Sequence, residues 1–120
     1  MVVRRMKTYT AATGYVYQYY FVGKREALAG EVEGPATEFI FDVTPDRKNT
    51  YAASVFLLKN AVDAWAAAHG RSLSETEQYA AAKLRLFQGF DEVEKFRESG
   101  RHLLIEYQNL EELLGTLGIE

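Results

Sequence analysis

The sequence predicts an α+β domain in which a four-stranded, mainly antiparallel sheet carries two or three helices on one face, in the order β-β-β-α-α-β-α. Three observations support this fold class. Apolar and polar side chains alternate along residues 37–44, aromatic residues recur at every second position along residues 15–21, and residues 74–77 read Ser-Glu-Thr-Glu, a helix capping box. We expect one domain over residues 1–120, with residues 1–7 as a flexible extension.

The first strand is expected to run from about Tyr9 to Val22 and is unusually aromatic. Successive side chains of a strand point to opposite faces, so four rings would share one face: Tyr15, Tyr17, Tyr19 and Phe21. The opposite face would carry Val16, Gln18, Tyr20 and Val22. Because both sets are largely apolar, each face needs a cover, which could be the helices, a loop, a second subunit or a ligand.

Residues 37–44 and 51–58 are predicted to pair as an antiparallel hairpin. The first of these segments places apolar side chains at alternate positions, which is typical of a half-buried strand. Pro45 presets the backbone for a turn, and Asp46 supplies a side-chain acceptor for backbone N–H groups. These two residues therefore favour a reversal of the chain between the strands.

Two helices should follow the hairpin. Asn60 can cap the first of them, and Gly70 should end it because glycine tolerates the left-handed conformation. The second begins at the capping box, where Ser74 accepts a bond from the backbone and Glu77 reaches back to the N–H of Ser74. We expect this second helix to run to about Glu92.

A fourth strand and a short helix complete the predicted fold. Apolar and polar residues alternate along residues 102–107, as they do in a strand with one buried face. Asn109 and Glu112 then repeat the spacing of a capping box ahead of a leucine-rich segment. The last helix is therefore expected to start at Asn109.

Lys83 occupies an unexpected place in the second helix. At 100° per residue it lies at the centre of the apolar stripe formed by Tyr79, Ala80, Leu86, Phe87 and Phe90. The simpler interpretation is that its stem packs on the sheet while the ammonium reaches the edge or an acidic group such as Asp42 or Glu38. The alternative is that Lys83 binds an anion at the floor of a pocket, or loses its proton and acts as a base or nucleophile.

The composition excludes several classes of site. The chain has no cysteine, which excludes thiol catalysis and cysteine-ligated zinc. Neither His69 nor His102 has a second ligand at metal-binding spacing, so no metal and no cofactor is predicted. Ser54 and Ser72 lack the context of a nucleophile, and no catalytic residue is assigned. We therefore expect a binding or assembly module rather than an enzyme.

No membrane partner is predicted. The chain has no apolar run near the ~18 residues of a membrane span, and no secretory signal follows the basic residues at its start. Together with the lack of cysteine, this favours the cytoplasm. Met1 and Met6 are both candidate start residues.

Nucleic acid is a weak alternative for the aromatic strand. Exposed rings could stack on bases, and four cations could contact phosphates: Lys24, Arg25, Arg47 and Lys48. The net charge of −3 argues against this role, because nucleic-acid binding depends largely on neutralising phosphates. These cations are more simply read as solvated residues at strand ends and turns.

Two other roles for the aromatic surface are stronger. The favoured one is a homodimer that buries Tyr15, Tyr17 and Tyr19 against a second copy. The other is a cleft between sheet and helices that binds a small anionic ligand. Its walls would be Tyr17, Tyr19, Trp65 and Phe87, with Lys83 as the polar anchor.

Overall fold

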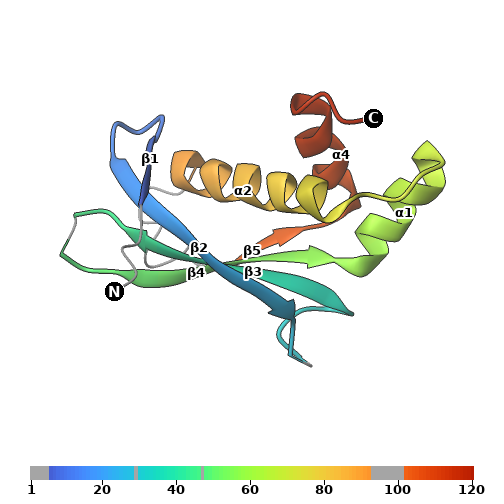
Figure 1. Ribbon diagram of the computed structural model, residues 1–120, viewed down its shortest axis with the longest axis horizontal. Helices are drawn as coiled ribbons and strands as arrows, with labels where there is room; N and C mark the ends of the chain where they lie inside the picture. The colour runs from blue at the N-terminus through green and yellow to red at the C-terminus, as the bar shows by residue number, and fades with distance from the viewer. Residues whose placement is uncertain (1–5, 29, 47, 93–101) are drawn as a thin grey trace.

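The computed structural model describes residues 6–28, 30–46, 48–92 and 102–120, and the fold is given for these residues. The elements are β1 (Lys7–Thr10), β2 (Val16–Glu26), β3 (Ala36–Thr44), β4 (Tyr51–Leu58), α1 (Lys59–His69), α2 (Glu75–Glu92), β5 (His102–Ile105) and α4 (Tyr107–Thr116). Figure 1 shows a curled sheet with α2 and α4 on one side and α1 at one end. The predicted α+β class is confirmed.

The sheet has five strands in the order β1-β2-β3-β4-β5, one more than predicted. The long first strand that the aromatic pattern suggested is in fact two antiparallel strands, with Tyr9 opposite Tyr17. Gly14 makes the break possible, because its φ of +94° suits a residue without a side chain. The N–H of Ala11 closes the turn by donating to the carbonyl of Tyr15 at 2.8 Å.

The predicted hairpin is confirmed as β3 and β4, which pair with Phe41 opposite Ala53. In its turn, the Asp46 carboxylate accepts the backbone N–H groups of Lys48 at 2.9 Å and Asn49 at 2.8 Å. The last strand, β5, pairs with β4 in parallel, which makes the sheet mixed. The helices between β4 and β5 allow this crossover, because a parallel pair cannot be joined by a tight turn.

A β-bulge interrupts the pairing of β2 with β3. Phe21 lies opposite Phe41, but Gly23 lies opposite Ile40, so Val22 is the extra residue. The alternation of faces shifts by one residue at this point. As a result Lys24 shares the face of Phe21, and Arg25 turns to the opposite face beside its partner Glu38.

The helix boundaries follow local signals only in part. The expected cap at Asn60 is wrong, because α1 begins at Lys59 directly after β4 without a side-chain cap. The N–H of Lys59 instead donates to the carbonyl of Pro35 at 2.9 Å, so the backbone satisfies this donor. Gly70 ends α1 as predicted, with φ +72°.

The capping box of α2 is confirmed. The N–H of Glu77 donates to Ser74 Oγ at 3.1 Å, and the N–H of Ser74 donates to Glu77 Oε1 at 2.9 Å. The start of α4 differs from the prediction, since the helix begins at Tyr107 rather than at Asn109. Asn109 still caps it, but from the third helical position, because its Oδ1 accepts the N–H of Glu106.

The core lies between the sheet and the helices. Side chains on the face of the sheet that the helices cover are buried: Tyr17, Tyr19, Phe39, Phe41, Val43, Ala53, Val55 and Ile105. The opposite face, called the outer face, has none of the described helices over it (Figure 1). It carries Val16, Gln18, Tyr20, Val22, Arg25, Glu38, Ile40, Asp42, Ser54 and Phe56.

None of the described helices is long and apolar enough to cross a membrane.

Candidate functional site

Aromatic rings join β1 and the first half of β2 to α2. Tyr17 stacks on Phe90 with ring centroids 4.2 Å apart, and Tyr9 stacks on Phe87 at the same distance. Tyr19 meets the edge of Phe87 at 5.4 Å. Tyr17 and Tyr19 are each only 4% exposed, so α2 covers this side of β2.

Tyr15 has a different position from the other rings of its predicted set. It lies in the turn before β2 and is 56% exposed. The turn beside it is held against the end of α2 by Asp91. One carboxylate oxygen of Asp91 accepts the Tyr9 hydroxyl at 2.7 Å, and the other accepts the N–H of Ala12 at 2.8 Å. Asp91 thereby fixes the position of the β1–β2 hairpin.

The bond to Asp91 should be visible in the titration of Tyr9. Its hydrogen bond to Asp91, together with burial and the nearby negative charge, raises the pKa of Tyr9 to about 12. In an Asp91→Asn variant we expect this pKa to fall toward the ordinary value of about 10. NMR titration of Tyr9 with labelled tyrosine ring carbons measures the change. Glu92→Gln is the control, and an unchanged Tyr9 titration in Asp91→Asn would contradict the contact.

Lys83 lies over aromatic rings. Its Nζ is 5.8 Å from the centroid of Tyr19 and 5.9 Å from that of Phe87, within the range of a cation–π contact. The carboxylates suggested as its partners, Asp42 and Glu38, belong to the outer face, on the other side of the sheet. The half-buried lysine is therefore accommodated by the rings of Tyr19 and Phe87.

Trp65 is held in a separate cluster at α1. Its ring stacks on His69 with centroids 4.1 Å apart, and the guanidinium of Arg71 lies 5.0 Å from its centroid. The structure thus brings Tyr19, Phe87 and Lys83 together but gives Trp65 different neighbours. The indole is fully buried, and its Nε1 has no hydrogen-bond partner among the described residues.

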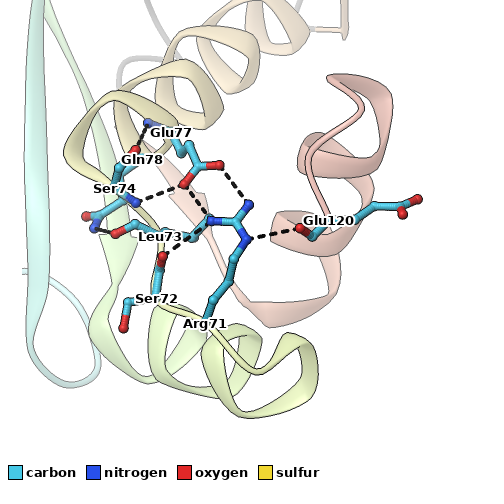
Figure 2. A network of polar contacts seen from close by, with 7 residues as sticks. All are labelled: Arg71, Ser72, Leu73, Ser74, Glu77, Gln78 and Glu120. Carbon is cyan, nitrogen blue, oxygen red and sulfur yellow. Dashed lines mark hydrogen bonds and ion pairs between the residues drawn. The ribbon is translucent and has the colours of Figure 1, made fainter.

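Arg71 links three parts of the chain in the network of Figure 2. It donates to both carboxylate oxygens of Glu77, at 2.9 and 2.8 Å, and to the carbonyl of Glu120 at 3.1 Å. The hydrogen bond from Arg71, together with the bonds from Ser74, lowers the pKa of the Glu77 carboxyl to about 2. The network ties the end of α1, the start of α2 and the C-terminus together, which is a structural role.

A polar cluster lies in the middle of the outer face. Glu38 is only 4% exposed, and both of its carboxylate oxygens are satisfied. Oε1 accepts Arg25 Nε at 2.7 Å, and Oε2 accepts Ser54 Oγ at 2.6 Å. His102 lies beside Ser54 in the pairing of β5 with β4. We call Arg25, Glu38 and Ser54 the outer-face cluster.

The electrostatics of Glu38 favour its charged form. Burial raises the pKa of its carboxyl, but the bonds from Ser54 and Arg25 and the charge of Arg25 outweigh burial, so the pKa lies below 4.5. A buried carboxylate is tolerated only when such partners satisfy it. The Ser54 hydroxyl donates directly to this carboxylate, so the cluster lacks the serine–histidine pair of a catalytic triad.

The described cations among those proposed for phosphate contacts, Lys24, Arg25 and Lys48, do not gather on one surface. Lys24 and Arg25 point to opposite faces of β2 and are paired with Glu75 and Glu38, respectively. Lys48 lies in the β3–β4 turn, at the other end of the sheet from these two. Arg47 lies outside the described residues. These three described cations therefore form no continuous basic surface.

The outer-face cluster was missed at the level of sequence because its members come from three strands. Strand alternation alone would place Arg25 on the same face as Phe21, away from Glu38. The bulge at Val22 reverses that assignment. The glycine that follows it was the available signal, since a glycine inside a strand often marks a bulge.

Metal binding has no support in the described part of the chain, where no group of three or more histidine, aspartate or glutamate side chains converges. No family model matches the chain, and searches of curated proteins and of solved structures find no similar protein.

Proposed function

We propose that the protein is an assembly module that forms a homodimer through the outer face of its sheet. The observation that carries this proposal is the exposure of apolar side chains on that face. Val16 is 49% exposed and Val22 is 47% exposed; half-buried Tyr20 lies between them on β2, and half-buried Ile40 lies on β3 opposite Gly23. An apolar strip with hydrophilic neighbours is a common feature of protein interfaces.

The outer-face cluster suits a dry contact. Glu38 is already desolvated and bonded to Arg25 and Ser54, so docking would leave no carboxylate of this cluster without a partner. Arg25 and Glu38 also offset each other in charge, so two copies of this part of the face would repel each other little. Two twisted sheets can then pack face to face across a two-fold axis.

This interface differs from the one that the aromatic pattern suggested. Tyr17 and Tyr19 are 4% exposed beneath α2 and could reach a partner only if the helix moved. Val16, Tyr20 and Val22 belong to the opposite set of the same strand and are accessible without any rearrangement. The proposal therefore keeps the homodimer and transfers its contacts to the other face.

Arginine on this face should prevent dimerisation. Multi-angle light scattering of the wild type is expected to give twice the chain mass of 13.6 kDa, and Val16→Arg/Val22→Arg should give one chain mass. The reason is that each interface would then bury four unpaired guanidinium groups. Both valines are about half exposed in one chain, so the substitutions should leave the fold intact.

Leu117→Arg is the matched control. Leu117 is 41% exposed and lies at the end of α4, away from the outer face, so this variant should remain a dimer. Far-ultraviolet circular dichroism should give the same spectrum for all three proteins. A wild type of one chain mass at high micromolar concentration would refute the proposal.

A further inference from the structure

A groove of about 270 Å³ opens between the second half of β2 and the first turn of α2. It is lined by Phe21, Lys24, Phe39, Glu75, Thr76 and Tyr79. Pockets for drug-sized ligands measure roughly 300–1,000 Å³, so this groove suits a smaller molecule. A single ring with a short side chain is the size that we consider.

The walls of the groove are aromatic. Phe21 meets Tyr79 edge to face, with centroids 4.8 Å apart, and lies 6.4 Å from Phe39. Tilted rings of this kind can accept a further ring against a face or an edge. An aromatic ligand would thus cover apolar surface that now contacts water.

The charge at the rim favours an anion. Lys24 Nζ lies 3.3 Å from Glu75 Oε1, but the side chain of Glu75 is 85% exposed, so this ion pair is weak and easily exchanged. Lys7 lies on a smaller adjoining hollow that shares Phe21 and Tyr79 with the groove. The first turn of α2 adds the positive end of a helix dipole, which Glu75 and Glu77 of the same turn partly offset.

We infer that the groove binds a small aromatic carboxylate. Its ring would lie among Phe21, Phe39 and Tyr79, and its carboxylate would replace Glu75 at the ammonium of Lys24. In the empty protein Glu75 occupies the place of the ligand's charge, and this competition gives the inference a specific test. The groove lies on the helix side of the sheet, so this binding goes beyond the proposed dimer and does not depend on it.

The test uses 3-phenylpropionate as the probe and follows backbone amide signals by NMR. We expect saturable shifts at Lys24 and Thr76. Lys24→Met should weaken binding about three-fold, and Glu75→Gln should tighten it about three-fold, because each change removes one side of an exposed ion pair. Glu75→Gln is the more informative variant, since a damaged site cannot explain a gain in affinity.

Two controls separate this site from general attraction to cations. Lys59 also lies at the start of a helix and pairs with an exposed carboxylate, Glu26, at 3.2 Å, so Lys59→Met should bind the probe like the wild type. The neutral amide 3-phenylpropionamide should bind more weakly than the acid, and Lys24→Met should reduce this difference. The inference is overturned if no saturable shift occurs, if acid and amide bind equally, or if Glu75→Gln fails to tighten binding.

Discussion

Trp65→Ala should lower the free energy of unfolding by about 3–5 kcal/mol, the usual cost of deleting a large buried aromatic side chain. Trp65 is fully buried and contacts both His69 and Arg71, so its loss removes the surface on which these residues rest. Urea denaturation monitored by far-ultraviolet circular dichroism measures the change. Tryptophan fluorescence is unsuitable because Trp65 is the one tryptophan of the chain, and the substitution removes it.

Trp65→Phe is the matched variant, and its expected cost is only about 1–2 kcal/mol. The indole N–H has no hydrogen-bond partner among the described residues, so phenylalanine would lose packing area but no such bond. If phenylalanine destabilised the protein as much as alanine does, the indole N–H would have to make an interaction that this arrangement lacks.

Arg25→Met should lower the free energy of unfolding by about 2–3 kcal/mol, because it leaves the buried carboxylate of Glu38 with one partner fewer. Ser54 would remain as the other donor. Lys59→Met breaks an ion pair with a carboxylate that is 84% exposed, so it should cost less than about 1 kcal/mol. Urea denaturation at pH 7 compares the two variants.

The pH dependence of stability gives a second measure of the same cluster. The pKa of Glu38 in the folded protein is below 4.5. The charged carboxylate therefore contributes to stability at pH values above the pKa of Glu38 in the unfolded chain, and this contribution is lost as the pH falls through the pKa in the folded protein. In Arg25→Met, burial should dominate and raise the pKa of Glu38. Its contribution would then be present at low pH and lost as the pH rises.

Arg25→Met/Glu38→Gln should recover much of the lost stability, because the amide can stay bonded to Ser54 without a buried charge. It should also remove the dependence on pH that Glu38 causes. Identical pH profiles for the wild type and Arg25→Met would show that Arg25 does not control the ionisation of Glu38.

The parts of the fold that sequence predicts are those fixed by neighbouring residues. The capping box at Ser74 and the turn at Asp46 depend on contacts within three residues, and both occur as predicted. The break at Gly14 is also local, since Ala11 and Tyr15 close the turn, but the aromatic alternation concealed it. The start of α1 at Lys59, by contrast, depends on a contact between segments distant in sequence. Lys59 needs no side-chain cap because Pro35, far away in sequence, supplies the acceptor.

The candidate surfaces were less predictable than the fold, because faces depend on register. The aromatic set was correctly grouped along β2 at Tyr17, Tyr19 and Phe21, which share the helix side. The side of the sheet that the helices would cover could not be read from a strand with two apolar faces. The neighbours of Trp65 depend on packing between helices, which no local pattern encodes.

The bulge at Val22 makes the two proposed surfaces depend on one backbone irregularity. It turns Arg25 toward Glu38 on the outer face and Lys24 toward Glu75 on the helix side. If the strand continued through Val22 with regular alternation and no bulge, the two cations would exchange faces, and both surfaces would lose their charge in a single step. Self-association and ligand binding therefore depend on the same shift of alternation, whereas point substitutions can separate them.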